Sequence, residues 1–211
     1  GYDVVCCVRD KSRFNPPQSL KEKISVIEID LLNPSSLSTI PNDIDVAYYL
    51  VHSMSTSDNY KSLEQKCAIN FRDRLSNTHV KQVIYLSGIV NESNLSKHLL
   101  SRKIVEEELE KGNYNLTCLR AGIIVGSGSA SFEIMRDLIE KLPVMITPKW
   151  LLTKCQPIGV SDVQTFLTKC ILNEETFNRN FDIGCDDVLS YREMLLDFAK
   201  IRNLKRRIWT V

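Results

Sequence analysis

The sequence predicts an α/β protein built on a doubly wound parallel sheet. Short apolar runs rich in β-branched residues alternate along the chain with longer segments of helical period, and this alternation is the pattern of βαβ units. Most of the short runs are apolar at successive positions, as expected of strands that helices cover on both faces. We therefore expect a parallel sheet between layers of helices.

The expected strands are the apolar runs at 4–8, 26–29, 46–51, 82–86, 116–121 and 181–183. The expected helices lie between and after them, at 60–77, 96–111, 131–142, 161–172 and 190–202. The first helix should carry one apolar stripe, because apolar residues recur there at four-residue intervals: Leu63, Cys67, Phe71 and Leu75. The second should turn Leu99, Val105 and Leu109 inward and its glutamates outward, and should stop near Gly112.

Local signals mark the ends of the later helices. Pro143 should end the third helix, and Ser161 with Asp162 offers a cap for the fourth. The fifth should open with a capping box, since Glu193 follows Ser190 by three residues. The final RRIWTV is typical of a strand, and we interpret the basic cluster at 205–207 as a solvated helix end rather than a binding patch.

Composition excludes several classes of protein. With 27 Lys and Arg against 26 Asp and Glu, the net charge of +1 gives no reason to expect a nucleic-acid or membrane partner. No apolar run approaches the roughly 20 residues of a membrane span. Seven cysteines without a CxxC pair favour reduced thiols and a cytoplasmic location, with Cys118, Cys170 and Cys185 in the core. Three separated histidines offer little for a metal site.

The chain reads as a single domain, residues 1–211, with a small substrate-side portion from about residue 126 onward. It opens on a strand, GYDVVCCVRD, and nothing near this strand matches GxGxxG; the one glycine cluster, Gly126 and Gly128, comes much later. A parallel sheet of this type normally begins one βα unit earlier. We therefore expect the first βα unit to be missing from these 211 residues.

Six segments together resemble one family. They are YYLVHSM from Tyr48, VIYLSGI from Val83, LSKHLLSRKIVEEEL from Leu95, LRAGIIVGSGSASFE from Leu119, LPVMITPKW from Leu142 and QPIGVSDV from Gln156. In order and spacing they are similar to the extended and atypical short-chain dehydrogenase/reductases, most closely to the NmrA-like or YbjT-like, nucleoside-diphosphate-sugar epimerase-like subgroup. The resemblance implies an NAD(P)-binding Rossmann-like domain in an oxidoreductase-like or epimerase-like protein.

The resemblance places Arg9 where related proteins meet the adenosine ribose. An arginine there can bind a 2′-phosphate through its planar donors, whereas an acidic residue would bind a 2′-hydroxyl. This favours NADP over NAD, with Lys11, Ser12 and Arg13 as further phosphate contacts; the alternative is an ordinary surface arginine. Without the glycine loop, the 211 residues alone should bind the nucleotide weakly, because the backbone N–H groups that hold a pyrophosphate are missing.

Other cofactor contacts follow from the same resemblance. Asp30 and Leu31 correspond to an acidic-apolar pair that holds the adenine, unless Asp30 serves only a turn or cap. The remaining expected cofactor residues lie at strand ends: Val51, His52 and Ser53 near the ribose and nicotinamide, Gly88, and Ala121, Gly122 and Ile123 near the nicotinamide amide. His52 is of interest only by its location, since a lone histidine at a strand end is usually a structural residue. Gly122 permits close backbone approach.

Catalysis is where the sequence departs from the family. Ser87 stands in the position of the catalytic serine, but His98 and Arg102 occupy the i, i+4 positions of the family's Tyr and Lys. Histidine can act as an acid or base near neutral pH, whereas arginine does not readily lose its proton. Arg102 could instead clamp an anion, or both could be ordinary surface residues. The alternative to an enzyme is therefore a non-catalytic NADP(H) sensor or scaffold that binds a protein partner or forms a homodimer.

Two downstream features remain open. GSGSASF could open a helix whose N–H groups bind an anion such as a substrate phosphate, or it could be a plain loop and cap. Gln156, Pro157 and Asp162 match family architecture, and we interpret Asp162 as a helix cap rather than a catalyst.

Overall fold

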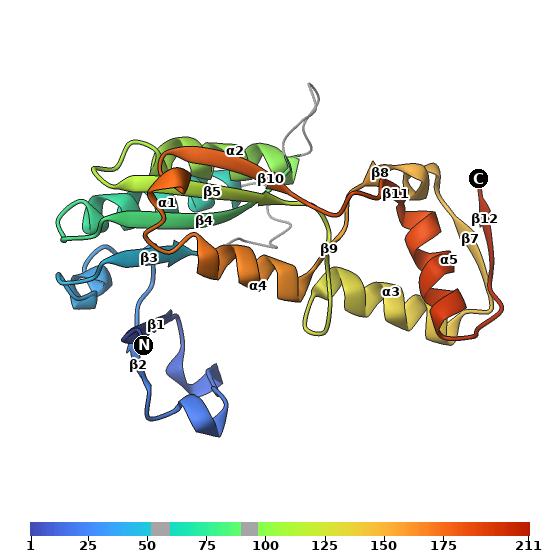
Figure 1. Ribbon diagram of the computed structural model, residues 1–211, viewed down its shortest axis with the longest axis horizontal. Coiled ribbons are helices and arrows are strands. Elements are labelled where there is room, and N and C mark those ends of the chain that lie inside the picture. The colour runs from blue at the N-terminus through green and yellow to red at the C-terminus, as the bar shows by residue number, and fades with distance from the viewer. Residues whose placement is uncertain (52–59, 90–96) are drawn as a thin grey trace. The chain divides into compact units, whose positions relative to one another are not determined.

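The computed structural model describes residues 1–51, 60–89 and 97–211 and shows the expected alternation of strands and helices (Figure 1). The chain divides into two compact units. The first comprises Gly1–Tyr85, Val90–Cys118 and Glu174–Arg179; the second comprises Leu86–Ile89, Leu119–Asn173 and Asn180–Val211. Strands β4, β5 and β10 each contribute residues to both units.

All six expected strands are present, with ends shifted by up to two residues. They are β1 (Val4–Val8), β2 (Ile24–Glu28), β3 (Val46–Tyr49), β4 (Gln82–Gly88), β5 (Asn115–Ala121) and β10 (Arg179–Ile183). Five short strands that the sequence did not reveal are β6 (Ile124–Val125), β7 (Val144–Thr147), β8 (Lys154–Cys155), β9 (Ile158–Gly159) and β11 (Leu189–Ser190). The predicted terminal strand is β12 (Arg207–Thr210). The helices are α1 (Tyr60–Leu75), α2 (Lys97–Leu109), α3 (Ala130–Lys141), α4 (Val160–Lys169) and α5 (Tyr191–Ile201).

The main sheet has the strand order β10-β5-β4-β3. Strands β3 and β4 pair in parallel. Strands β4 and β5 run the same way too, because backbone hydrogen bonds join their starts (Asn115 N–H to Lys81 C=O) and the residues at their ends (Ile89 N–H to Ala121 C=O). At the other side of β5, Gly122 donates to Ile183 at the end of β10. The predicted parallel sheet is confirmed.

Strands β1 and β2 form a separate parallel pair in which Val8 lies opposite Glu28. In the described part of the chain, β1 pairs only with β2 and the outer edge of β3 has no strand partner. Burial follows pairing: β4 is almost wholly buried, whereas β1 and β3 keep exposed residues such as Val4 and Tyr48. The expectation of strands covered on both faces thus holds for β4 and fails for β1.

The core of the first unit lies between the strands and helices α1 and α2, which pack side by side (Figure 1). Tyr49 of β3 makes edge-to-face contacts with Phe71 of α1 at 5.0 Å and with Tyr85 of β4 at 5.7 Å, measured between ring centroids. Such pairs add to the free energy gained by burying the ring area. Burial also raises the pKa of the Tyr49 hydroxyl.

Two details of the predicted helix faces were wrong. Leu63 is exposed, and Ala68 shares the buried face of α1 with Phe71 and Leu75 instead. In α2, Glu106 and Glu108 are buried rather than solvated. They are accommodated because each has polar partners: Glu106 accepts a hydrogen bond from the Cys118 thiol, and Glu108 accepts bonds from Gln65 and Arg72 of α1. Buried carboxylates need such partners, and a periodicity argument does not detect them.

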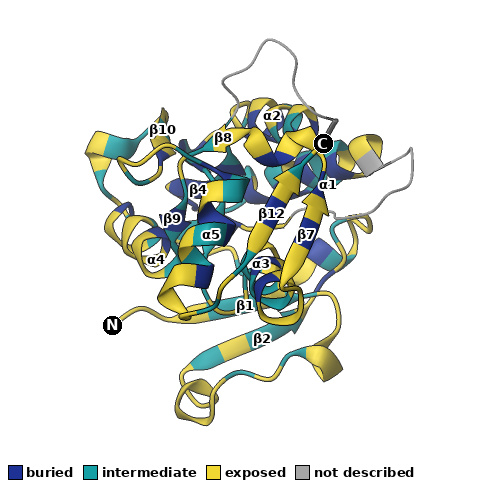
Figure 2. Ribbon diagram, turned by 90° about the vertical axis from the view of Figure 1, so that its right-hand side faces the viewer, coloured by how far each residue is buried: buried dark blue, intermediate teal, exposed yellow. Residues whose placement is uncertain are grey.

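The second unit has its own core. Buried residues of α3, β7, α5 and β12 meet there, among them Ile139, Met145, Leu195 and Ile208. Strands β7 and β12 form a two-stranded parallel sheet whose side chains alternate between buried and exposed (Figure 2). All seven cysteines are thiols in no disulfide; Cys118 and Cys170 are buried as expected, and Cys185 is half-buried.

The helix caps were predicted with mixed success. At α5 the capping box is present: the Ser190 hydroxyl accepts from Glu193 N–H, and the Glu193 carboxylate accepts from Ser190 N–H. At α4 the prediction was wrong, because the cap residue is Gly159 and Ser161 and Asp162 lie inside the first turn. Helix α3 ends at Lys141, two residues before Pro143, as expected.

Replacing Ser190 with alanine should lower the free energy of unfolding by about 1 kcal/mol at neutral pH, the usual cost of losing an N-cap. Hydrogen bonds from the Ser190 backbone N–H, and then from its hydroxyl, lower the pKa of Glu193. The stability that Glu193 supplies is therefore present above the ordinary glutamate pKa of about 4.3 and is lost as the pH falls through the lowered value. Urea unfolding at about pH 7 and about pH 3 should show the Ser190→Ala effect shrinking in acid.

The matched control is Ser161→Ala, which removes a hydroxyl from a first turn without removing a cap. It should change the free energy of unfolding by less than about 0.5 kcal/mol. Equal losses for the two substitutions would contradict the cap assignments.

Candidate functional site

The carboxyl ends of β1 and β2 bring two predicted cofactor residues to one edge of that strand pair. The Val8 carbonyl accepts a hydrogen bond from Ile29 N–H, so Arg9 and Asp30, each the next residue along the chain, emerge together. Both residues are exposed. The sheet edge at strand carboxyl ends is where nucleotides bind in doubly wound folds.

The loop after β1 is held by its own polar contacts. The Asp10 carboxylate accepts from the Ser12 backbone N–H at 2.9 Å and from the Ser12 hydroxyl at 2.6 Å, and Lys11 N–H donates to Glu28. These Ser12 hydrogen bonds, the hydroxyl's first, lower the pKa of Asp10. The Ser12 hydroxyl is therefore already committed to Asp10, which leaves Arg9, Lys11 and Arg13 as the side chains of this loop that suit a phosphate.

Asp30 takes the local role that the sequence left as the alternative. One carboxylate oxygen accepts from Leu32 N–H at 2.9 Å and so caps the turn after β2. Leu31 packs partly buried against the first unit's core, and its carbonyl accepts from Asn70 of α1. The Asp30–Leu31 pair is thus fixed by neighbours on both sides, and the second Asp30 oxygen has no hydrogen-bond partner among the described residues.

For several predicted site residues the structure gives little information about a ligand contact. Val51 is exposed, two residues beyond the end of β3. His52 and Ser53 lie outside the described residues, and so does the side chain of His98, whose backbone is in the first turn of α2. Arg102 is half-buried, and its carbonyl lies 3.4 Å from the Tyr85 hydroxyl that donates to it.

Ser87 combines burial with an unsatisfied hydroxyl. It lies on β4 next to Gly88, and its side-chain oxygen is buried without a hydrogen-bond partner among the described residues. An unpaired buried hydroxyl costs folding free energy, so native proteins seldom keep one without a reason. A reacting group that bound beside Ser87 would supply the missing partner.

Three backbone groups around Gly122 form hydrogen bonds within the chain. Ala121 C=O accepts from Ile89, Gly122 N–H donates to Ile183, and Ile123 C=O accepts from Ile158. These three groups are therefore already engaged and do not offer themselves to a nicotinamide amide. Beyond β5, Gly122 C=O and Ile123 N–H have no backbone partner among the described residues.

The close approach that Gly122 permits is to the chain itself. A Cβ on Gly122 would lie 2.0 Å from the Gln156 carbonyl oxygen, and one on Gly184 would lie 2.9 Å from the Gln156 Cβ. Gln156 is held there by a hydrogen bond from its side-chain amide to the Cys185 carbonyl at 2.9 Å. Gln156 is thus the residue against which two strand-end glycines pack, a role that sequence reasoning missed although Gly122 was singled out.

The GSGSASF segment forms the plain loop and helix start. Gly126 and Gly128 both have positive φ, and Ser129 is the N-cap residue of α3. The Glu133 carboxylate accepts from Gly128 N–H at 3.3 Å, and Arg136 forms an ion pair with Glu133. A carboxylate of the chain therefore sits at this helix start, which disfavours the anion site.

Neither a metal site nor a membrane-spanning helix is found among the described residues. No group of histidine, cysteine, aspartate or glutamate side chains among them is placed to hold a metal ion. None of the helices in the described part of the chain combines the length and apolar character that a membrane span requires.

Comparison with known proteins supplies the fold. No protein-family model and no curated protein matches the sequence, but solved structures match it. An epimerase from Methanothermobacter thermautotrophicus has a TM-score of 0.79 at 11% identity, covering 100% of this chain and 73% of that one. UDP-glucuronic acid 4-epimerase from Bacillus cereus, solved with UDP-glucuronic acid and NAD, has a TM-score of 0.75 at 16% identity, covering 100% and 78%. A short-chain dehydrogenase/reductase superfamily protein from Agrobacterium tumefaciens with bound NAD gives 0.71 at 14%, covering 93% and 75%.

The chain shares the doubly wound α/β fold of these solved structures. In this doubly wound fold, ligands bind at the carboxyl ends of the strands, and two sets of described residues lie at such ends. One is Arg9 with Asp30 in the first unit; the other is Ser87 with Gly122 in the second. Identities of 11–16% establish the shared fold and leave the chemistry to the residues.

Gly122→Ala should lower the free energy of unfolding by at least about 2 kcal/mol, because the new methyl group would collide with a backbone carbonyl that cannot rotate away. Denaturant unfolding measures the loss. Gly159→Ala is the control, since the one close contact that its Cβ would make is with the flexible Asp162 carboxylate at 2.8 Å, and the next, with the Ser161 hydroxyl, is an ordinary contact at 3.7 Å. A Gly122→Ala protein as stable as Gly159→Ala would contradict the packing described around Gln156.

Ser87→Ala should leave the free energy of unfolding unchanged or raise it by up to about 1 kcal/mol, because it deletes an unpaired buried hydroxyl. Thr117→Val is the comparison variant, because it removes a buried hydroxyl that does have partners. The Thr117 hydroxyl accepts a hydrogen bond from Gln82 at 2.8 Å and donates one to the Thr176 carbonyl at 2.9 Å. That substitution should cost about 1–3 kcal/mol. If Ser87→Ala lowered the free energy of unfolding as much as Thr117→Val does, the Ser87 hydroxyl would have a structural partner and would not be free to bind a ligand.

Proposed function

We propose that the protein binds NAD(P)(H), with NADP favoured, and is oxidoreductase-like or epimerase-like. The carrying observation is that β1 and β2 deliver Arg9 and the Asp30–Leu31 pair to the strand edge where nucleotides bind in this fold. Support also comes from the fold neighbours, several of which were solved with NAD. Their sugar-nucleotide ligands suggest the same class of substrate for this chain.

In this proposal Arg9 binds the 2′-phosphate and Asp30 the adenine amine. The guanidinium is exposed, so it can reach a phosphate with two parallel hydrogen bonds. Lys11 and Arg13 add positive charge beside it, whereas Asp10 and Glu28 hold the loop by accepting its N–H and O–H groups. Asp30 keeps one carboxylate oxygen for the adenine because the other caps the turn, and Leu31 covers the ring edge. Val51, with His52 and Ser53, follows β3 toward the ribose and nicotinamide.

Catalysis, where it occurs, centres on Ser87. When bound, the nicotinamide accepts or returns a hydride at the substrate carbon. The Ser87 hydroxyl would donate a hydrogen bond to the substrate oxygen, which explains why it is buried without a partner among the described residues. His98 would hold or deliver the proton of that oxygen near neutral pH, and Arg102 would orient an anionic group of the substrate. Gly88 and the remaining backbone groups of Gly122 and Ile123 line the same strand ends.

A specific observation also favours a second candidate function. The i, i+4 pair on α2 is His98 and Arg102 where active relatives carry Tyr and Lys. Such a protein could bind NADP(H) without turning over a substrate and signal its occupancy to a protein partner or within a homodimer. We propose a cytoplasmic location for either function, in keeping with seven cysteine thiols and no disulfide.

The test is a calorimetric titration of NADPH and NADH against the protein. NADPH should bind more tightly than NADH. Arg9→Ala should raise the Kd of NADPH about tenfold or more, because a charge-assisted contact is lost, and should leave the Kd of NADH nearly unchanged.

Lys23→Ala is the matched control, since Lys23 is an exposed cation that precedes β2 instead of following β1. It should alter neither affinity. Absence of binding of either nucleotide would overturn the proposed function, and equal affinities that Arg9→Ala does not change would overturn the preference for NADP. Turnover of any sugar nucleotide or carbonyl compound that Ser87→Ala abolishes would decide for an enzyme over a sensor.

A further inference from the structure

The basic cluster Lys205, Arg206 and Arg207 is not the helix end that the sequence suggested. Helix α5 ends at Ile201, and Arg207 begins strand β12. The cluster therefore belongs to the turn and strand start that follow α5, and the three side chains have different surroundings.

Arg206 is fixed at the carboxyl end of a neighbouring helix. Its Nε donates to the Ile139 carbonyl and its Nη2 to the Glu140 carbonyl at 3.2 Å, both in the last turn of α3, while Nη1 donates to the Lys205 carbonyl at 3.1 Å. A cation at a helix carboxyl end is favourable because the last carbonyls lack partners. This structural role accounts for Arg206 but not for the two cations beside it.

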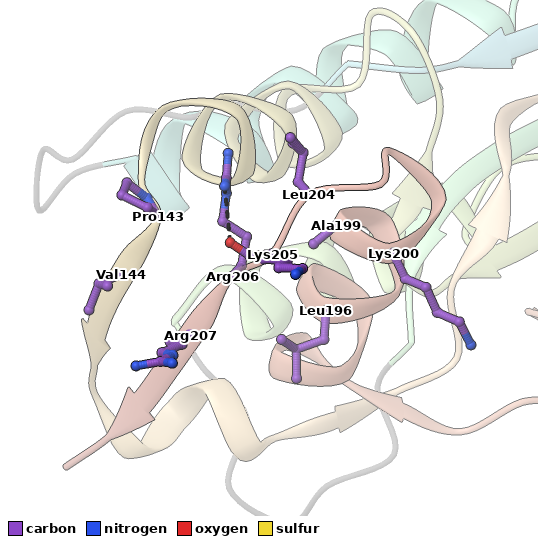
Figure 3. A pocket seen from close by; sticks show the side chains of 9 residues that line it. All are labelled: Pro143, Val144, Leu196, Ala199, Lys200, Leu204, Lys205, Arg206 and Arg207. Atoms are coloured by element: carbon purple, nitrogen blue, oxygen red, sulfur yellow. Dashed lines mark hydrogen bonds between the residues drawn. The ribbon is translucent and has the colours of Figure 1, made fainter.

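Lys205 and Arg207 are exposed, and across the described residues their side chains make no hydrogen bond or ion pair. They line a concavity of about 580 Å³ together with Lys200 and Arg206. Figure 3 shows Arg207 at the start of β12 and Lys205 beside Arg206, whereas the Lys200 side chain extends from α5 away from these three. None of the nine lining residues is acidic, so the concavity carries positive charge that no carboxylate of its lining offsets.

The rest of the lining is apolar. It consists of Leu196, Ala199 and Leu204 on and after α5, and Pro143 and Val144 at the start of β7. Val144 lies opposite Arg207 in the β7–β12 pair, which sets an aliphatic side chain directly beside a guanidinium. Val144 is 47% exposed, so this apolar surface is open to a ligand.

We propose that this concavity binds an organic anion with an apolar body. The anionic group would lie against Arg207 and Lys205, and the apolar part against Val144, Leu196 and Leu204. The volume falls within the roughly 300–1,000 Å³ of small-molecule sites. A guanidinium beside a lysine matches the geometry of a phosphate, sulfonate or carboxylate. All nine lining residues belong to the second unit and none is among the proposed cofactor or catalytic residues, so the site stands apart from the proposed function.

The experiment compares two fluorescent probes of nearly one shape, 8-anilinonaphthalene-1-sulfonate, which is anionic, and N-phenyl-1-naphthylamine, which is neutral. Lys205→Glu combined with Arg207→Glu should raise the Kd of the sulfonate about tenfold or more and change the Kd of the neutral probe less than about twofold. Lys149→Glu combined with Lys169→Glu is the control of equal charge, at exposed cations of η4 (Lys149–Leu152) and α4. It should leave both probes nearly unaffected.

Val144→Ser tests the apolar part of the proposed site. It should raise the Kd of both probes, because it removes aliphatic surface at an exposed position. Unchanged melting temperatures in all three variants would show that lost binding is not lost folding. Saturating NADPH should not displace the sulfonate. Displacement by NADPH, or equal sulfonate affinity in the two charge-reversal variants, would overturn the proposal, whereas the proposed function would fail only in the nucleotide titration.

Discussion

Parallel strand pairing, in the main sheet of β3, β4, β5 and β10 and in the separate β1–β2 pair, is the constraint on which the candidate site depends. Parallel strands require long crossover connections, and their carboxyl ends fall at one edge. Hydrogen bonds fix the register near both ends of the pairing. Near the strand starts, the buried Gln82 side chain donates to Thr117, whose hydroxyl donates to the Thr176 carbonyl; at the strand ends, Ile89 pairs with Ala121 and Gly122 with Ile183. The register of the sheet therefore places Ser87 near the end of β4, where its buried hydroxyl has no hydrogen-bond partner among the described residues.

Close backbone packing decides how the strand ends are used. Gly122 and Gly184 both lie against Gln156, so these glycines permit chain segments to approach one another before they permit any ligand to approach. Two carboxylates are likewise used within the chain. Asp30 accepts a hydrogen bond in its own turn, and Glu133 accepts one at the start of α3. Among the described residues, the groups without such contacts include the Arg9 guanidinium, one Asp30 oxygen and the Ser87 hydroxyl.

The sequence predicted the alternation of elements, the six principal strands and the α5 capping box, because each depends on local period or spacing. It did not predict β6, β8, β9 and β11, which are two residues long and form only because distant segments meet. The sequence also did not predict the burial of Glu106 and Glu108, because their partners lie on other elements: Cys118, Gln65 and Arg72. At the site, the positions of Arg9 and Asp30 were predictable because residues following parallel strands emerge together. The role of Gln156 was not, because no pattern in the sequence links it to Gly122 and Gly184.

The central claim is that a dinucleotide binds at the strand carboxyl ends through residues that this chain supplies. Backbone amide chemical shifts, recorded by NMR on isotopically labelled protein as NADPH is added, test it most directly. The account predicts shifts concentrated at Arg9, Asp30 and Leu31 and at Ser87 and Gly122, with residues 205–207 unchanged. Shifts confined to the α5–β12 region, or no shifts at any NADPH concentration, would contradict it.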